Sequence, residues 1–227
     1  FPEAVLSNNL ELVKQYYYDI VQKDIMARYD VRDKDMLEKM GVFLFSNSAK
    51  TLSVSALSKL YNLSHQTAAN YIGYFKDAFL FFDLPQFSYS LKTTQKAFKK
   101  MYAVDTGMAN AVSMSFSEDR GRMLENAVFL HLKRAGGELY YYKGKSGEVD
   151  FVVKRADGSL GLVQVCWGLS DAKTKEREVA SLTAAMKDLR VTDAVIVTFD
   201  ESGELKLSEG GVQVLAQLYQ SLLCFLY

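Results

Sequence analysis

The sequence predicts an α/β protein built from two modules, the first over residues 1–110 and the second over residues 111–227. In the first module, apolar residues recur at helical spacing on both sides of a short turn, which is typical of a winged helix-turn-helix. The second module alternates a helix, three strand patterns, a helix and a buried strand. That order predicts a mixed sheet flanked by helices.

Composition narrows the range of functions. Apolar residues make up 49% of the 227 residues, which is enough for a buried core. Lys+Arg 27 balance Asp+Glu 27, so a nucleic-acid site would have to be a local basic patch. The two cysteines, Cys166 and Cys224, form no disulfide framework or ligand cluster, which suits a reducing, cytoplasmic compartment.

The amino-acid sequence predicts no targeting or membrane-spanning segment. The chain opens without a signal peptide, and its apolar runs are too short or too charged to span a membrane. It also opens without Met, so we expect it to be part of a longer protein.

The first module is mainly helical. Asp33 and Ser64 each precede an apolar-periodic segment and are candidate N-caps. A turn at residues 62–64 separates the two helices of the expected helix-turn-helix. The helices predicted in this module cover residues 8–29, 33–45, 53–61 and 65–82.

This module carries the candidate nucleic-acid contacts. The second helix of the motif would offer His65, Gln66 and Asn70 to a DNA groove. Strand-like pieces over residues 82–102 flank a basic loop, a predicted wing with the lysines Lys92, Lys96, Lys99 and Lys100. The helix lacks Arg, the commonest base reader, so phosphate contact through the wing is favoured over base recognition, and a pure packing module remains the alternative.

The second module supplies the predicted sheet. Gly136-Gly137 ends its first helix, and a turn at residues 156–158 joins two of its strands. A charged hairpin and a final helix from about Val212 are expected to close the chain. The other elements are a helix over residues 118–134, strands over 139–142, 148–154 and 160–167, a helix over 174–189 and a strand over 194–199.

Three motifs do not support the chemistry they suggest. Gly144-Lys145-Ser146 lacks the upstream glycine and the following helix of a P-loop. The only histidines, His65 and His131, have no partners at zinc or triad spacing. Cys166 lies between apolar neighbours, which raise a thiol pKa, so packing is the favoured interpretation over nucleophilic catalysis.

The strands over residues 148–154 and 160–167 place polar groups together. Alternation puts Glu148 and Asp150 on one side of the first strand, and Gln164 and Cys166 on one side of the second. If the strands pair, a carboxylate, an amide and a thiol gather at one point.

This constellation resembles the PD-(D/E)xK nuclease superfamily, in which an Asp and an Asp or Glu hold Mg²⁺ and a Lys orients water. The resemblance implies that Glu125 matches the helix acid and that Asp150 matches the motif Asp, a metal ligand. Gln164 then stands at the Asp-or-Glu position and Cys166 at the Lys position. The implied domain is a restriction-endonuclease-like sheet with a degenerate site.

Over nearly its whole length the chain also resembles the C-terminal half of a family of prokaryotic AAA+-type ATPases. In that family a P-loop domain precedes a winged helix and a degenerate nuclease-like domain. The resemblance implies that the chain's partner is its own N-terminal ATPase domain, and that ATP binds only in that missing half. The motifs are Phe1-Pro2-Glu3, Tyr18-Asp19-Ile20, Lys23-Asp24-Ile25, Leu63-Ser64-x-x-Thr67 with Tyr71, Tyr102-x-x-Asp105-x-Gly107, Glu125-Asn126 and Gly147-Glu148-Val149-Asp150-Phe151.

The departures from the nuclease pattern affect the expected function. Gln164 offers only a neutral oxygen to a hard dication, and Cys166 cannot supply an ammonium group. Activity would need Glu148 as a second carboxylate and a migrated lysine, for which the candidates are Lys143, Lys145 and Lys154. We therefore expect a non-catalytic binding and assembly region with no cofactor of its own.

Two alternatives stay open: a Mg²⁺-dependent DNA endonuclease and a pure protein–protein interaction module. Nucleic acid is a candidate partner of the endonuclease and also of the expected binding and assembly region. The sequence leaves the oligomeric state undecided.

Overall fold

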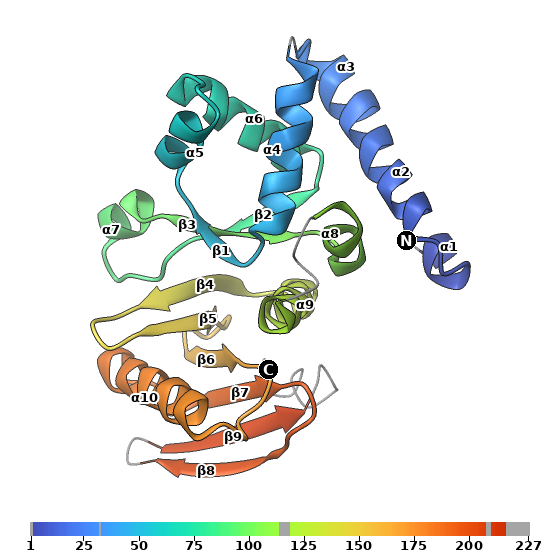
Figure 1. Ribbon diagram of the computed structural model, residues 1–227. Helices are drawn as coiled ribbons and strands as arrows, with labels where there is room; N and C mark the ends of the chain where they lie inside the picture. Colours follow the sequence, from blue (N-terminus) through green and yellow to red (C-terminus); the bar gives the residue numbers. More distant parts are fainter. Residues whose placement is uncertain (1, 32, 114–118, 208–209, 217–227) are drawn as a thin grey trace. The chain divides into compact units, whose positions relative to one another are not determined.

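The computed structural model describes residues 2–31, 33–113, 119–207 and 210–216. These residues form two compact units. The first comprises Phe1–Asp83 and Lys99–Asp119, and the second comprises Leu84–Phe98 and Arg120–Tyr227. The chain therefore enters the second unit, returns to the first and enters the second again. Helices and a mixed sheet together confirm the predicted α/β class (Figure 1).

The first unit has the predicted helix-turn-helix. Asp33 and Ser64 cap the helices that follow them, accepting from the backbone N–H groups of Met36 at 2.9 Å and Thr67 at 3.0 Å. The helices are α1 (Pro2–Leu6), α2 (Leu10–Ile20), the π-helix η1 (Val21–Met26), α3 (Ala27–Tyr29), α4 (Lys34–Ser46), α5 (Val54–Leu60), α6 (His65–Asp77) and α8 (Thr106–Val112). The strands β1 (Lys50–Leu52), β2 (Phe81–Leu84) and β3 (Lys99–Ala103) form a sheet in the order β1-β3-β2.

Two elements of this unit differ from the prediction. Helix α6 ends at Asp77 instead of residue 82, because Phe79 adopts a left-handed φ of 55° and β2 begins at Phe81. Helix α8 was not predicted, although Asp105 caps it by accepting from the Met108 N–H at 2.7 Å. The Tyr102-x-x-Asp105-x-Gly107 motif thus contains a helix start.

The wing segment, defined as residues 84–98, is more ordered than the basic loop expected from the sequence. It contains the helix α7 (Leu91–Lys96). The whole segment belongs to the second unit, where Gln86 forms a parallel bridge with Tyr141 of β4.

The second unit contains the predicted mixed sheet. Its order is β4-β5-β6-β7-β9-β8, in which β4, β5 and β6 pair antiparallel and β6, β7 and β9 pair parallel. The strands are β4 (Glu138–Lys143), β5 (Glu148–Lys154), β6 (Leu160–Val165), β7 (Ala194–Thr198), β8 (Gly203–Leu207) and β9 (Gly210–Ala216). The helices are α9 (Arg120–Ala135) and α10 (Ala172–Leu189).

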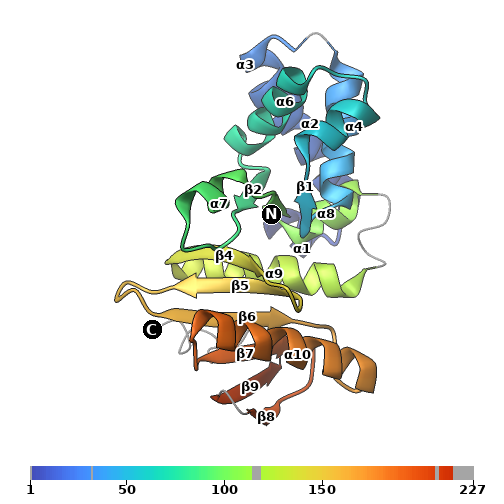
Figure 2. The ribbon, with the colours of Figure 1, turned by 90° about the vertical axis from the view of Figure 1, so that its left-hand side faces the viewer.

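The two helices cover opposite faces of the sheet (Figure 2). Leu182 of α10 packs in one cluster with Val152 of β5 and Leu162 of β6. Phe129 of α9 lies 6.3 Å, centroid to centroid, from Phe151, which points to the other face.

The predicted final helix from about Val212 is wrong at its start. Val212 lies in β9 and pairs in parallel with Ala194, while β8 pairs antiparallel with β9. The pattern Val212-Gln213-Val214 alternates buried and exposed side chains, which is the period of a strand. Residues 217–227 lie outside the described part of the chain.

Candidate functional site

The site begins with an irregularity in β5. The register between β4 and β5 shifts between Tyr140 and Tyr142, so Tyr140 faces Val152 while Tyr142 faces Val149. As a result Val149 and Val152 both belong to the core beneath α10, which strict alternation does not allow. Asp150 lies within this bulge and is 8% exposed.

The bulge places the Asp150 side chain against the backbone of β6. Its Oδ2 accepts from the Val165 N–H at 2.9 Å. In the other direction, the Asp150 N–H donates to Gln164 Oε1 at 3.4 Å. Two hydrogen bonds between a side chain of one strand and a backbone N–H of the other therefore continue the contact where the regular β5–β6 ladder ends.

Glu178 of α10 completes the cluster, and the sequence analysis missed it. Gln164 Nε2 donates to Glu178 Oε2 at 2.7 Å, and Arg177 holds the other oxygen, with Nη2 2.6 Å from Oε1. Glu178 is buried at 7% exposure, in line with Leu182 on the apolar face of α10. A glutamate at an apolar helix position was the available signal, since buried carboxylates are rare unless paired.

Cys166 lies beside this cluster as a protonated thiol. Its side chain belongs to the core beneath α10 and is 6% exposed. Burial, followed by the negative charges of Glu178, Glu201 and Asp150, raises the pKa of Cys166 to about 12. A buried, protonated thiol is a poor nucleophile at neutral pH.

The structure therefore brings together Asp150, Gln164 and Cys166, as the strand pairing predicts. The other predicted members are placed around them. Glu148 begins β5 opposite Lys143, and Glu125 is half-buried on α9. Of the candidate lysines, Lys143 and Lys145 are exposed at the β4–β5 turn, whereas Lys154 ends β5 and pairs with Glu138 at 3.1 Å.

The side chains of Asp150, Gln164 and Cys166 do not fit the ligand set of a magnesium site. The Asp150 carboxylate binds a backbone N–H, the Gln164 amide is engaged on both sides, and the adjacent thiol is protonated. Within the described residues, no group of three or more His, Cys, Asp and Glu side chains is arranged to hold a metal ion.

The helix-turn-helix presents a polar face with few charges. His65, Gln66 and Asn70 are exposed on α6, and Gln66 Nε2 donates to Asn70 Oδ1 at 2.8 Å. Further along the helix, Asp77 accepts from the Tyr29 hydroxyl at 2.8 Å. A face that ends in a carboxylate is poorly matched to phosphate.

Of the four lysines predicted for the wing, Lys92 and Lys96 lie in the wing segment, while Lys99 and Lys100 lie in β3. Lys92 and Lys96 are exposed on α7. Lys99 binds Asp83 at 2.8 Å, and Lys100 is buried at 4% exposure. Lys92 and Lys96 are therefore the wing lysines best placed for a phosphate backbone.

The start of the wing segment is held against the edge of β4. The Tyr141 N–H donates to the Pro85 carbonyl at 3.0 Å, and the Phe87 N–H donates to the Tyr141 carbonyl at 2.7 Å. The Tyr141 hydroxyl donates to the Phe98 carbonyl at 2.6 Å. Tyr141 thus binds both ends of the segment, and α7 is carried between two anchored points.

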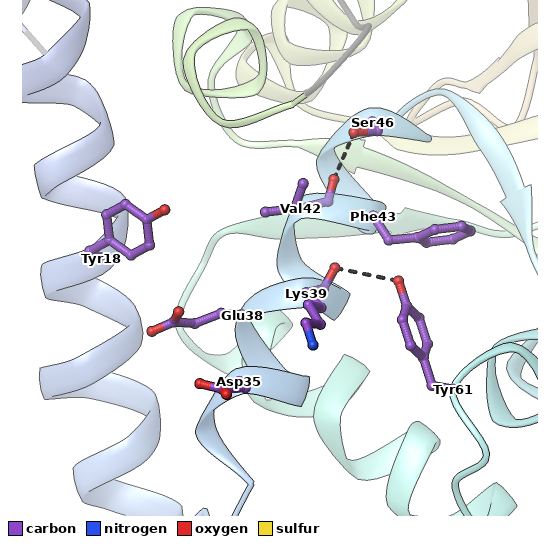
Figure 3. A pocket seen from close by; sticks show the side chains of 8 residues that line it. All are labelled: Tyr18, Asp35, Glu38, Lys39, Val42, Phe43, Ser46 and Tyr61. Atoms are coloured by element: carbon purple, nitrogen blue, oxygen red, sulfur yellow. Dashed lines mark hydrogen bonds between the residues drawn. The ribbon is translucent and has the colours of Figure 1, made fainter.

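A cavity of about 610 Å³ lies in the first unit between α2 and α4 (Figure 3). Tyr18 projects from α2 toward Glu38 and Val42 of α4 (Figure 3). On the other side of α4, the Tyr61 hydroxyl donates to the Lys39 carbonyl at 3.4 Å. Mixed aromatic and charged lining gives this cavity no defined chemistry.

The remaining histidine is a packing residue. His131 lies half-buried on α9, and its Nε2 is the one buried side-chain nitrogen or oxygen without a hydrogen-bond partner in the described part of the chain. Burial, followed by the charge of Arg134, lowers the pKa of His131. A neutral ring avoids placing a charge there.

The protein thus has two units, one with a helix-turn-helix and one with a mixed sheet. In the sheet unit, the buried polar side chains of Asp150, Gln164 and Glu178 are hydrogen-bonded within the protein. Residues 1–119, more than half of the chain, match the family DUF8612, described as a domain of unknown function, and the chain belongs to this family. Residues 120–216 match DUF4143, also described as a domain of unknown function. Domains of this second family are often found at the C-terminus of AAA-ATPase-like proteins.

Two curated relatives extend beyond this chain. An uncharacterized protein of Methanocaldococcus jannaschii, MJ1544, is 35% identical over 223 residues, covering 92% of this chain and 49% of the relative. An uncharacterized protein of Haemophilus influenzae is 28% identical over 179 residues, covering 75% of this chain and 44% of the relative. The chain thus spans about half the length of these relatives.

No solved structure matches the chain. In the described residues, the helices are too short or too polar to cross a membrane.

Proposed function

We propose that the chain is the non-catalytic C-terminal binding and assembly region of an AAA-ATPase-like protein, and that it contacts nucleic acid through the wing and through a nuclease-like groove expected beside Asp150. The observation that carries the non-catalytic part is the closed cluster of Asp150, Gln164 and Glu178. The Asp150 carboxylate accepts from the Val165 N–H, and the Glu178 carboxylate is bound by the Gln164 amide and the Arg177 guanidinium, so both carboxylates of this cluster are engaged by groups of the protein.

Exposed cations support the nucleic-acid part. Lys92 and Lys96 stand on a helix anchored at both ends, and Lys143 and Lys145 are exposed at the turn that leads into β5. Such lysines bind phosphates independently of sequence, and their affinity must fall as salt rises.

The first experiment is a binding titration of double-stranded DNA at two salt concentrations. Lys92→Ala/Lys96→Ala is expected to weaken binding and to reduce the salt slope by about 2, because each lost phosphate contact removes about one unit. The matched control is Lys34→Ala/Lys187→Ala, which removes two exposed helical lysines outside the wing. Absence of salt-dependent binding to any nucleic acid would replace the proposal with a pure protein-interaction module.

The second experiment tests for cleavage. The chain is expected to leave plasmid intact in Mg²⁺ and in Mn²⁺. Metal-dependent nicking that disappears in Asp150→Ala would instead establish the endonuclease.

A third experiment tests assembly. The chain is mixed with the ATPase part of the longer protein, and a stable complex in size-exclusion chromatography is expected.

A further inference from the structure

An exposed aromatic pair lies where β6 and β7 end. Trp167 follows β6 and Phe199 directly follows β7. Their rings stack with centroids 4.2 Å apart and planes 13° from parallel. The Phe199 N–H donates to the Trp167 carbonyl at 3.1 Å. The backbone therefore holds the two rings in fixed register before any ligand arrives.

The pair retains an accessible surface. Trp167 is 36% exposed and Phe199 is 39% exposed. Two adjacent large aromatic side chains that share an exposed surface are a candidate binding site. The position agrees, since ligands of sheets with parallel strands bind beyond the carboxyl ends of those strands.

Charges around the rings are arranged unevenly. The guanidinium carbon of Arg120 lies 5.4 Å from the Trp167 ring centroid, within cation–π range. Glu201 accepts from the Leu169 N–H at 2.9 Å, so its carboxylate is turned to the backbone. Asp200, next to Phe199, is exposed. The surroundings are thus not uniformly basic, and stacking must supply more of the affinity than charge.

We propose that the Phe199 ring, backed by the stacked Trp167 ring, stacks against an unpaired base of a single-stranded nucleic acid, with Arg120 contacting the neighbouring phosphate. This inference rests on the proposed nucleic-acid contact and names the form of nucleic acid that the sheet unit takes. Every base has a flat π-face that suits parallel rings, and in a duplex that face is covered. A guanidinium beside the rings supplies the phosphate partner.

Trp167 provides the measurement, because it is the single tryptophan of the chain. The full chain is titrated with an oligothymidylate, an oligouridylate, a blunt-ended DNA duplex and thymidine monophosphate, with tryptophan emission as the readout. Both single strands are expected to quench the emission. The duplex and the monophosphate are expected to leave it nearly unchanged at the same concentration.

Variants separate stacking from general attraction. Phe199→Ala, measured by quenching, and Trp167→Ala, measured by anisotropy of a labelled single strand, are expected to weaken binding by about 5- to 100-fold. Trp167→Phe keeps a ring and should retain most of the affinity, so a folding defect in the alanine variant does not decide the test. Leu10→Ala, at another exposed apolar side chain, is the control and should bind as the parent chain does.

Distinct results overturn distinct statements. Salt-dependent DNA binding without quenching, unchanged in Phe199→Ala, would refute the stacking site and leave the proposed function standing. Quenching by the monophosphate as strong as by the oligomers would refute the single-strand assignment. Self-association that Trp167→Ala abolishes, with no effect on nucleic acid, would make the pair a protein interface. No binding of any nucleic acid would refute this inference and the proposed contact together.

Discussion

Gln164 Nε2 donates to Glu178 Oε2 at 2.7 Å, and both side chains are buried. The amide thereby gives a carboxylate inside the sheet unit one of its two polar partners, while Arg177 gives the other. A carboxylate at position 164 would face Glu178 as a like charge at hydrogen-bond distance. The amide that departs from the nuclease pattern is thus the residue that this arrangement requires.

Removing the Gln164 amide should destabilise the second unit. Gln164→Leu leaves the buried Glu178 oxygen without a donor, which is expected to lower the free energy of unfolding by about 1–3 kcal/mol. Urea denaturation followed by circular dichroism measures the change. Gln213→Leu, at an exposed position of β9, is the control and should shift the midpoint little. Equal midpoints for both variants would contradict the importance of the Gln164–Glu178 bond.

Cys166 should be unreactive in the folded protein. In a Cys224→Ser background, a thiol reagent at neutral pH is expected to label Cys166 far more slowly in the native state than in denaturant, because the thiol is buried and protonated. Rapid native labelling would show that the site opens readily.

The same thiol gives stability a dependence on alkaline pH. The folded pKa of Cys166, about 12, lies above the value of about 8.5 for an unfolded chain, so the folded state binds the proton more tightly. Stability should therefore fall as the pH rises above about 8.5, and this part of the decline should be missing in Cys166→Ala. Parallel denaturation curves at alkaline pH for the two proteins would argue against the shift.

Asp83 should stabilise the first unit at neutral pH. Burial alone would raise the pKa of this carboxyl, but the hydrogen bonds from Lys76 and Lys99 outweigh it and lower the pKa. The stabilisation is present above the unfolded pKa of about 3.9 and is lost as the pH falls through the lower folded value. Asp83→Asn is expected to cost about 0.2–1 kcal/mol at neutral pH and nothing in strong acid. Asp24→Asn, at an exposed helical position, is the control, and thermal melts across pH are the measurement.

The β4–β5 turn should tolerate no side chain at Gly147. This glycine has a φ of 149°, and an added Cβ would collide with the Ser181 hydroxyl and lie 2.9 Å from the Ser181 Cβ. Gly158 has a φ of 83° but open space around it. Gly158→Ala should therefore show backbone strain alone, about 1–2 kcal/mol, while Gly147→Ala should lose about 1–3 kcal/mol more through the collision. Similar losses in the two variants would mean that the turn moves away from α10.

Local patterns predicted much of the fold. The bounds of β5 were predicted as found, because its apolar run ends in turns, and Asp33 and Ser64 were identified as caps because hydroxyl and carboxylate side chains accept from helix N–H groups. The final helix was wrong where Val212 joins a strand, since pairing with Ala194 depends on a partner eighteen residues earlier that periodicity does not reveal.

The cluster around Asp150 was predicted only in part. Strand alternation identified Gln164 and Cys166 as neighbours, but the bulge that turns Asp150 toward the Val165 N–H depends on pairing with β4. Glu178 comes from a helix packed across the sheet, so its approach to Gln164 is a tertiary contact. Stacking of Trp167 on Phe199 likewise depends on β6 and β7 lying side by side.

Residues 84–98 belong to the second unit, although the chain on both sides of them belongs to the first. A cut at residue 119, where the two family matches meet, would leave this stretch in the N-terminal fragment, separated from the sheet that it pairs with. In the C-terminal fragment, the edge of β4 at Tyr141 would then be exposed to solvent, and exposed strand edges pair with other molecules. Fragments intended for expression should graft the stretch onto the sheet, since trimming at the family boundary favours aggregation.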